Sequence, residues 1–215
     1  SVLGGGSWGT VLAYLASLNG NYVSLWVRDK ELVETINQSR VNQRYLPSLD
    51  LSSKIKATSD MQDIESSDTV IFCVPSDAFR EVSELASSYI QESSYLITAT
   101  KGVEKEGFSL MSQILEEHYP ANSIGVISGP NLAEEIAEGQ LSGTVIASQD
   151  ATLRNSVIKD LSNDFFKVYE NNDPYGVEMG GALKNIYAIA CGIADGLNSG
   201  ENTIGMIMTR GLGEM

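Results

Sequence analysis

The sequence predicts an α/β protein: a doubly wound parallel sheet of Rossmann type, followed by the start of an all-helical second domain. Three observations lead to this prediction. A glycine-rich turn with Gly4, Gly6 and Gly9 follows residues 1–3, which are predicted to end a buried strand, and it opens an amphipathic run. Apolar, strand-like runs alternate with helical patterns up to residue 171, as in sheets whose strands are joined by helices. Beyond residue 171 the strand signal ends and helical periodicity continues alone.

The first ten residues fit the G-x-G-x-x-G pattern of a dinucleotide-binding strand, turn and helix. In such a unit Gly4 permits the tight turn, Gly6 lets a pyrophosphate approach the backbone, and Gly9 lets the helix pack on the strand. The helix N-terminus offers unpaired N–H groups and a partial positive charge to the phosphates. Because 20 glycines can produce this pattern by chance, a plain structural turn is the alternative. The strand before it and the helix after it favour dinucleotide binding.

The residue after the second predicted strand, residues 22–27, bears on the choice of cofactor. This residue is Arg28, at the position where the adenine ribose of a dinucleotide lies. An acid there would hydrogen-bond the 2′-hydroxyl of NAD, whereas an arginine can pair with the 2′-phosphate of NADP. The neighbouring Asp29 keeps NAD open. We expect NADP to be preferred over NAD, and the alternative for Arg28 is a solvated strand end.

The remaining elements alternate up to a predicted domain boundary, with residues 1–171 forming the NAD(P)-binding domain and residues 172–215 the first part of a helical substrate-binding domain. The run 68–74 is almost continuously apolar, which is typical of a strand buried on both faces of a sheet. Residues 41–51, around Pro47, are expected to be irregular. The other predicted strands span residues 55–60, 94–100, 124–128, 143–148 and 165–169. The predicted helices span residues 7–19, 30–39, 77–88, 107–117, 132–138, 150–162, 175–197 and 203–215.

The composition describes an ordinary globular protein and excludes several classes of partner. With 14 basic and 28 acidic residues, the net charge of −14 repels nucleic acid and anionic membrane surfaces, so we expect neither as a partner. No apolar run is long enough for membrane insertion. Cys73, Cys191 and the single His118 offer no credible metal site, and a disulfide is not expected. These features favour a cytoplasmic location.

Two lysines and one turn are the candidate groups for chemistry. Lys101 follows a predicted strand at the edge of the sheet where ligands bind. Lys184 lies within the long helix among glycines and alanines, which we expect to leave it partly enclosed and able to trade protons; a snorkelling surface lysine is the alternative. The turn 128–131 precedes a helix and offers N–H groups to an anion, although a simple helix cap would explain it equally well.

Several segments occur together in a recognisable order: V-L-G-G-G-S-W-G-T, L-W, R-Y-L-P, V-P-S, A-T-K-G, S-G-P, G-G-A-L-K-N and T-R-G-L. In this order they resemble the bacterial NAD(P)-dependent glycerol-3-phosphate dehydrogenases over essentially the whole chain. The segments A-T-K-G (99–102) and G-G-A-L-K-N (180–185) are far more specific than the glycine turn. The resemblance implies an oxidoreductase that reduces dihydroxyacetone phosphate to sn-glycerol 3-phosphate for glycerophospholipid synthesis, with a small phosphorylated substrate as its partner.

The resemblance also assigns roles to individual residues. Lys184 matches the catalytic lysine, which would protonate the forming alkoxide and also contact the substrate. Lys101 resembles the lysine shared by cofactor and substrate. Gly129 and the position of Asn131 match substrate contacts. The residues that match cofactor contacts are Ser7, Trp8, Arg28, Tyr45 and Ala133.

The sequence departs from the family pattern at several points. Asn131-Leu132 replaces Ser or Thr followed by Phe, and Leu197-Asn198-Ser199-Gly200 replaces L-G-F-G. A later S-R-N segment is absent, and only three residues precede the glycine turn, so we expect a chain clipped at both ends whose 215 residues alone lack full activity.

The sequence is also compatible with two other functions. A related two-domain dehydrogenase acting on a hydroxy acid or sugar acid would share the same architecture. A cofactor-binding fragment without turnover is a non-enzymatic alternative. The oligomeric state is not set by the sequence, which leaves room for a homodimer through the helical domain.

Overall fold

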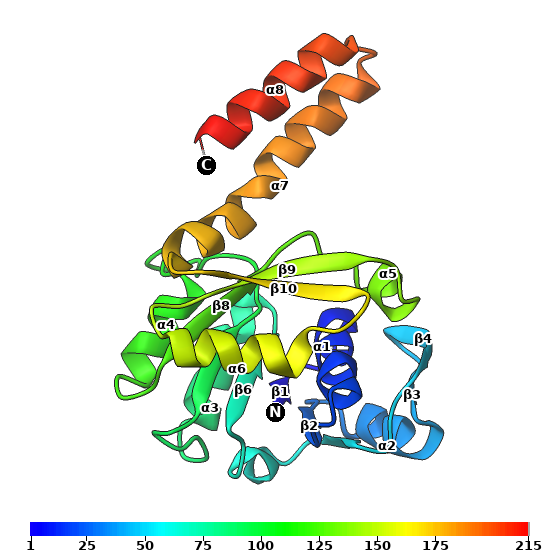
Figure 1. Ribbon diagram of the computed structural model, residues 1–215, viewed down its shortest axis with the longest axis vertical. Coiled ribbons are helices and arrows are strands. Elements are labelled where there is room, and N and C mark those ends of the chain that lie inside the picture. The colour runs from blue at the N-terminus through cyan, green and yellow to red at the C-terminus, as the bar shows by residue number, and fades with distance from the viewer. Residues whose placement is uncertain (215) are drawn as a thin grey trace.

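The computed structural model describes residues 1–214 and contains an eight-stranded sheet with helices on both faces (Figure 1). The strands of this sheet are β1 (Val2–Leu3), β2 (Val23–Trp26), β5 (Ile55–Thr58), β6 (Thr69–Phe72), β7 (Tyr95–Thr98), β8 (Ile124–Ser128), β9 (Ser142–Ala147) and β10 (Phe166–Asn171). Their order in space is β10-β9-β8-β7-β6-β1-β2-β5. The six strands β5-β2-β1-β6-β7-β8 follow the doubly wound order. In this order the chain adds strands on one side of β1 first and then on its other side.

The direction of β9 corrects the expectation of a wholly parallel sheet. The strands from β5 to β8 are parallel, but β9 runs antiparallel to β8, with Ile127 opposite Ile146. β10 in turn pairs parallel with β9. The connection from β8 to β9 covers residues 129–141 and holds only α5 (Ala133–Ala137), five residues long, whereas a parallel crossover usually carries a full helix.

The helices flank the sheet and continue beyond it. They are α1 (Ser7–Leu18), α2 (Lys30–Ser39), α3 (Phe79–Ala86), α4 (Met111–His118), α5, α6 (Ala151–Leu161), α7 (Pro174–Gly196) and α8 (Glu201–Glu214), with short 3₁₀ turns η1 (Met61–Ile64) and η2 (Ser76–Ala78). The helix predicted from residue 107 begins only at Met111. Gly107 and Phe108 have φ values of +96° and +58°, which a right-handed helix cannot contain.

A small hairpin replaces the irregular segment expected around Pro47. Strand β3 (Val41–Asn42) pairs antiparallel with β4 (Leu46–Asp50), with a register shift between Val41 and Asn42. The two strands have two and five residues, which is too short for a strand pattern to be recognised in the sequence. Proline is tolerated at Pro47 because β4 is an edge strand. The hairpin stands apart from the main sheet and lies near α1 and α5 (Figure 1).

Two apolar clusters hold the α/β part together, one on each face of the sheet. One cluster joins α1 and α6 to the sheet, and the other joins α3 and α4 to it. Adjacent residues of β7, Leu96 and Ile97, point into different clusters, and neither side chain is exposed. Strand burial on both faces, predicted from the apolar runs, is thereby confirmed for the centre of the sheet.

The helices α7 and α8 pack against each other and project away from the sheet (Figure 1). Helix α7 contacts the strands β8 and β9, and its start lies beside the sheet (Figure 1). Strand β10 ends at Asn171 and α7 begins at Pro174, on either side of the predicted domain boundary; the division into domains itself stays a prediction. No helix within residues 1–214 is long and apolar enough to span a membrane.

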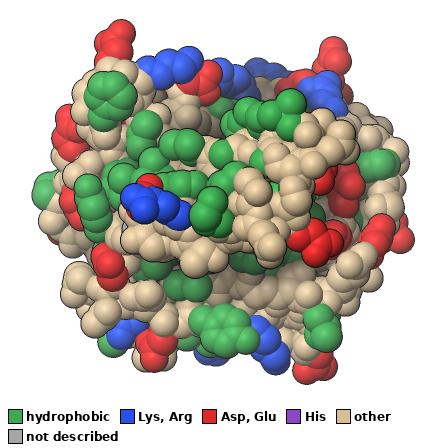
Figure 2. Space-filling view, turned by 90° about the horizontal axis from the view of Figure 1, so that it is seen from above, with side chains coloured by type: hydrophobic (Ala, Val, Ile, Leu, Met, Phe, Trp, Pro, Cys, Tyr) green, Lys and Arg blue, Asp and Glu red, His purple; other side chains and the backbone are tan. Residues whose placement is uncertain are grey.

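Hydrophobic side chains lie exposed on this projecting pair. Figure 2 looks onto this end of the molecule and shows hydrophobic side chains at its surface. The exposed apolar residues of the two helices include Ile186, Ile189, Ile193, Met206 and Leu212.

Candidate active site

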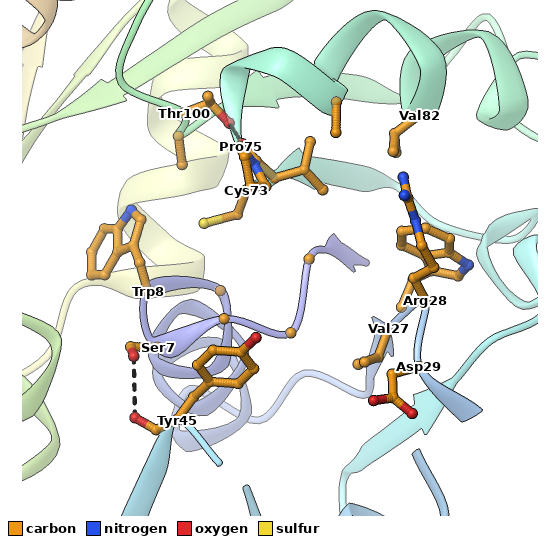
Figure 3. Close-up of a pocket in the computed structure, with 18 of the residues that line it drawn as sticks. Ser7, Trp8, Val27, Arg28, Asp29, Tyr45, Cys73, Pro75, Val82 and Thr100 are labelled. Carbon is orange, nitrogen blue, oxygen red and sulfur yellow. Dashed lines mark hydrogen bonds between the residues drawn. The ribbon is translucent and has the colours of Figure 1, made fainter. Parts of the chain in front are cut away.

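A cleft of about 660 Å³ opens where the chain leaves β1, β2, β6 and β7. It lies at the carboxyl edge of the sheet, next to the point where the strand order reverses, which is where open α/β sheets bind ligands. Figure 3 shows Trp8 and Arg28 at opposite ends of the cleft, with Cys73 between them. Of the residues predicted as a site, the cleft is lined by Gly4, Gly6, Ser7, Trp8, Gly9, Arg28, Tyr45, Lys101 and Asn131. Its described lining does not include Gly129, Ala133 or Lys184.

The glycine turn forms the floor of the cleft. Gly4 has a φ of +122°, and a Cβ there would lie 2.3 Å from the carbonyl oxygen of Cys73. A Cβ on Gly9 would lie 1.9 Å from the carbonyl oxygen of Gly4, so only glycine lets α1 approach the turn this closely. A Cβ on Gly6 would meet nothing within 4 Å and would project into open space. Gly6 is also the N-cap of α1 and offers no side-chain cap, which leaves the first-turn N–H groups available to an anion. The turn therefore fits a dinucleotide pyrophosphate.

The hairpin β3–β4 holds this turn in place from the side. The Asn42 side chain is fully buried, and its Nδ2 donates to the carbonyl oxygen of Gly5 and to the Thr10 hydroxyl, each at 2.9 Å. The Ser7 hydroxyl donates to the carbonyl oxygen of Tyr45 at 3.1 Å, the contact drawn in Figure 3. Sequence reasoning missed Asn42, because nothing in its neighbourhood signals that a polar residue of a short hairpin is buried against the turn.

Two arginines face the end of the cleft that lies beyond β2. The Arg28 side chain is 63% exposed and its Nη2 lies 3.5 Å from Oε2 of Glu81. The Asp29 carboxylate is already engaged, because it caps α2 by accepting two backbone N–H groups and accepts Nη1 of Arg44 at 2.7 Å. The hydrogen bond from Arg44 lowers the pKa of Asp29. Arg44 also lines the cleft. Sequence reasoning quoted it within R-Y-L-P but did not assign it to the site.

Lys101 follows β7 by three residues and reaches across to β8. Its Nζ donates to the carbonyl oxygen of Gly129 at 2.7 Å. Desolvation lowers the pKa of Lys101, and the positive charge of Lys184 lowers it further, while Cys73 acts weakly in the opposite direction. The Cys73 thiol itself is held protonated, because desolvation raises its pKa to about 12. Lys101 is therefore the cation of the cleft nearest to α7.

Helix α7 brings Lys184 into the neighbourhood of Lys101 through a close approach at Gly181. A Cβ on Gly181 would lie 2.4 Å from the Ser128 hydroxyl and 4.0 Å from Cγ of Lys101. Lys184 follows Gly181 by about one helical turn. Its side chain is exposed and its Nζ donates to Oδ1 of Asn185 at 3.0 Å. The expectation that neighbouring glycines and alanines would partly enclose this lysine is wrong, because within residues 1–214 this side of α7 faces open space.

The amide of Asn131 is turned toward β9. Its Nδ2 donates to the carbonyl oxygen of Gly143 at 3.1 Å, and its Oδ1 accepts the Thr144 hydroxyl at 3.0 Å. One N–H of the amide has no partner among the described residues, and Asn131 still lines the cleft. Ala133 begins α5 just beyond it. Gly129 takes part through its carbonyl oxygen, which accepts Lys101.

Comparison with known families agrees with this geometry. Residues 1–154 match the sequence model described as the N-terminus of NAD-dependent glycerol-3-phosphate dehydrogenase, and residues 173–215 match the C-terminus of the same family. The chain belongs to the NAD-dependent glycerol-3-phosphate dehydrogenase family. The earlier resemblance to this family and the predicted fold class are thereby confirmed, and the cofactor of the family is NAD or NADP.

Individual members of the glycerol-3-phosphate dehydrogenase family are similar to the whole chain. A protein of Alcanivorax borkumensis named glycerol-3-phosphate dehydrogenase [NAD(P)+] is 47% identical over 216 residues, which cover all of this chain and 63% of that protein. The protein of the same name from Acinetobacter baylyi is 48% identical and is covered to 60%. A crystal structure of glycerol-3-phosphate dehydrogenase from Coxiella burnetii superposes with a TM-score of 0.92 at 36% identity, covering 99% of this chain and 66% of that one. The chain thus spans 60% to 63% of the length of these two curated relatives.

Proposed function

We propose that this protein acts as a glycerol-3-phosphate dehydrogenase [NAD(P)+], reducing dihydroxyacetone phosphate to sn-glycerol 3-phosphate and supplying the backbone of glycerophospholipids. The observation that carries the proposal is the approach of two lysines, Lys101 and Lys184, beside a cleft floored by a dinucleotide-type glycine turn. Two cations suit a small ketone that carries a phosphate and develops negative charge on its oxygen. The name of relatives such as the Alcanivorax borkumensis protein supports the same activity.

In this proposal, residues that line the cleft bind cofactor and substrate, and the neighbouring Lys184 transfers the proton. The N-terminus of α1 holds the cofactor pyrophosphate, with Gly6 leaving room for it. When bound, NAD(P)H supplies a hydride to the carbonyl carbon of the substrate. The Lys184 ammonium donates a proton to the carbonyl oxygen, and in the reverse direction the neutral amine takes the hydroxyl proton. The Lys101 ammonium, at the carboxyl edge of the sheet, attracts the negative charges of the cofactor and the substrate between which it lies.

The preferred cofactor in this proposal is NADPH. Arg28 and Arg44 both line the end of the cleft beyond β2, where a 2′-phosphate would lie. Asp29 is committed to capping α2 and pairing with Arg44, so its carboxylate is not free for a ribose hydroxyl. Ser7, Trp8, Tyr45 and Ala133 complete the proposed cofactor contacts.

The substrate contacts are proposed on one side of the cleft. Gly129 and Asn131 lie at the end of β8, on the same edge as Lys101. The free N–H of the Asn131 amide can donate to a phosphate or hydroxyl oxygen of the substrate. Asparagine in place of Ser or Thr therefore alters the detail of this contact and keeps a donor there.

The experiment that tests the function measures NADPH oxidation by the naturally encoded protein with a panel of substrates. Dihydroxyacetone phosphate should support turnover, and 2-oxo acids and sugar acids should not. Turnover with a hydroxy acid or sugar acid alone would identify a related two-domain dehydrogenase. NADPH binding without turnover on any substrate would identify a cofactor-binding protein.

A homodimer through α7 and α8 and a cytoplasmic location belong to the same proposal. Exposed Ile186, Ile189 and Ile193 give the projecting helices an apolar surface suited to association. Two free cysteines, Cys73 and Cys191, are compatible with a reducing compartment. Light scattering on the naturally encoded protein should give twice the monomer mass, and the enzyme should fractionate with the cytosol.

A further inference from the structure

A buried carboxylate on α7 lies against the N-terminus of α4. The side chain of Glu178 is only 3% exposed. Its Oε1 accepts the backbone N–H of Ser112 at 3.1 Å, and its Oε2 accepts the Ser112 hydroxyl. One acidic side chain of α7 thus takes two donors from the first turn of another helix.

The first turn of α4 depends on this carboxylate. The N-cap of α4 is Leu110, whose apolar side chain cannot accept a hydrogen bond. The first N–H groups of a helix have no partner inside the helix and carry a partial positive charge. Glu178 supplies the missing acceptor and the opposite charge from a segment 66 residues away in sequence.

Within residues 1–214, the hydrogen bonds that join α7 side chains to the α/β part all converge on Glu178. Glu178, Gly181 and Lys184 follow one another along α7 in steps of three residues, each of which rises roughly 4.5 Å and turns the side chain by roughly 60° around the helix axis. Gly181, the middle member, packs against Ser128 and Lys101. The buried carboxylate of Glu178 therefore fixes the first of these three positions, and Lys184 is the last of them.

We propose that Glu178 is the positioning residue of the site: its buried contact with the α4 N-terminus sets the place of α7, and through Gly181 the place of Lys184 relative to Lys101. This inference rests on the proposed role of Lys184 and adds a residue that touches neither cofactor nor substrate. Helix α7 starts beside the sheet and projects away from it (Figure 1), so a small tilt at Glu178 displaces Lys184.

The buried negative charge of Glu178 lowers the free energy of unfolding. A role in positioning α7 can therefore be tested separately from a role in stabilising the fold. Burial raises the pKa of Glu178, and the nearby Glu116 carboxylate raises it further, whereas the hydrogen bonds from Ser112 act in the opposite direction. Glutamine at this position keeps one acceptor and removes the buried charge. Glu178→Gln should therefore still fold at neutral pH, but it should hold α7 less firmly because one of the two acceptors is lost.

The test compares Glu178→Leu, Glu178→Gln and Ser112→Ala in the naturally encoded protein, with Asp195→Asn, an exposed carboxylate farther along α7, as the matched control. Glu178→Leu should lower kcat about 100-fold while NADPH affinity, measured by fluorescence, changes less than about twofold, because the catalytic lysine alone is displaced. Glu178→Gln and Ser112→Ala should retain intermediate kcat, and the control should match the wild type.

A second readout does not depend on turnover. In ¹³C-methylated lysine NMR, the Lys101 pKa should rise in Glu178→Leu, as it should in Lys184→Ala, because the Lys184 charge that lowers it has moved away. If Glu178→Leu does not fold, Glu178→Gln should show the same rise to a smaller extent. An unchanged Lys101 pKa in the folded Glu178 variants would overturn the inference. Absence of turnover in the wild type would refute the proposed function and leave this titration as a valid test of positioning.

Discussion

The Nζ of Lys101 donates a hydrogen bond to the carbonyl oxygen of Gly129 at 2.7 Å, which ties the end of β7 to the end of β8. This contact holds a cation at the carboxyl edge of the sheet, directly under Gly181 of α7. The lysine on the sheet and the lysine on the helix are thereby brought near each other, although 83 residues separate their positions, 101 and 184.

The lowered pKa of Lys101 predicts how substrate binding depends on pH. Because desolvation and Lys184 both lower this pKa, Lys101 loses its proton at a lower pH than an ordinary lysine does. The KM for dihydroxyacetone phosphate should therefore be low while Lys101 is protonated and should rise as pH increases through its pKa. Steady-state kinetics across the alkaline range check this. Lys101→Arg stays charged and should abolish the rise; a rise that persists in this variant would assign it to another group.

Two glycine-to-alanine variants should separate cofactor binding from folding. Gly9→Ala places a Cβ 1.9 Å from the carbonyl oxygen of Gly4, so the free energy of unfolding should fall by about 1–3 kcal/mol. Gly6→Ala meets nothing within 4 Å, so stability should change by less than about 0.5 kcal/mol, while NADPH affinity falls because the methyl group enters the phosphate space. Urea unfolding and fluorescence titration measure the two effects. Equal NADPH affinity in Gly6→Ala and wild type would contradict the role of this turn.

Arg28→Asp should shift the cofactor preference from NADPH toward NADH. The substituted carboxylate repels a 2′-phosphate and can accept a ribose hydroxyl, and loss of a charged phosphate contact costs about 1.5–3 kcal/mol. The ratio of kcat/KM for the two cofactors checks this. Glu81→Gln, which frees Arg28 from its 3.5 Å partner, should change the ratio modestly in the opposite direction. An unaltered ratio in Arg28→Asp would show that Arg28 does not read the 2′-position.

Asn42→Ala should weaken both the fold and the cofactor site. The substitution leaves the carbonyl oxygen of Gly5 and the Thr10 hydroxyl without their buried donor, at a cost of about 1–3 kcal/mol in the free energy of unfolding. NADPH affinity should fall as well, because Gly5 belongs to the turn. Gln43→Ala, an exposed amide next in the chain, is the matched control and should behave as wild type. Unaltered stability in Asn42→Ala would contradict the role given to the hairpin.

Local patterns in the sequence predicted the main fold well. The glycine turn, the helix Lys30–Ser39 and the strand Ile124–Ser128 have the predicted bounds. These elements are signalled by features close together in the chain, such as the glycine spacing and the continuous apolar runs. No local feature predicts the direction of β9, because the same apolar run can form a parallel or an antiparallel strand.

The parts of the site that sequence reasoning missed depend on contacts between distant segments. Asn42 reaches Gly5 across 37 residues, and Glu178 reaches Ser112 across 66. Such pairs leave no periodicity in a single sequence. The catalytic role of Lys184 stays a prediction, and its expected surroundings were wrong, since the small residues beside it do not cover it within residues 1–214.

The measurement that tests the central claim most directly is the turnover of Lys184→Ala in the naturally encoded protein, with NADPH affinity measured on the same sample. Loss of the proton donor should lower kcat by about 10²–10⁴-fold, while the dissociation constant for NADPH stays within about twofold of wild type. Lys167→Ala, an exposed lysine on β10, is the control and should keep full activity. Retention of more than about half of the wild-type kcat by Lys184→Ala would contradict the account, because general acid catalysis by this lysine cannot be removed without loss of rate.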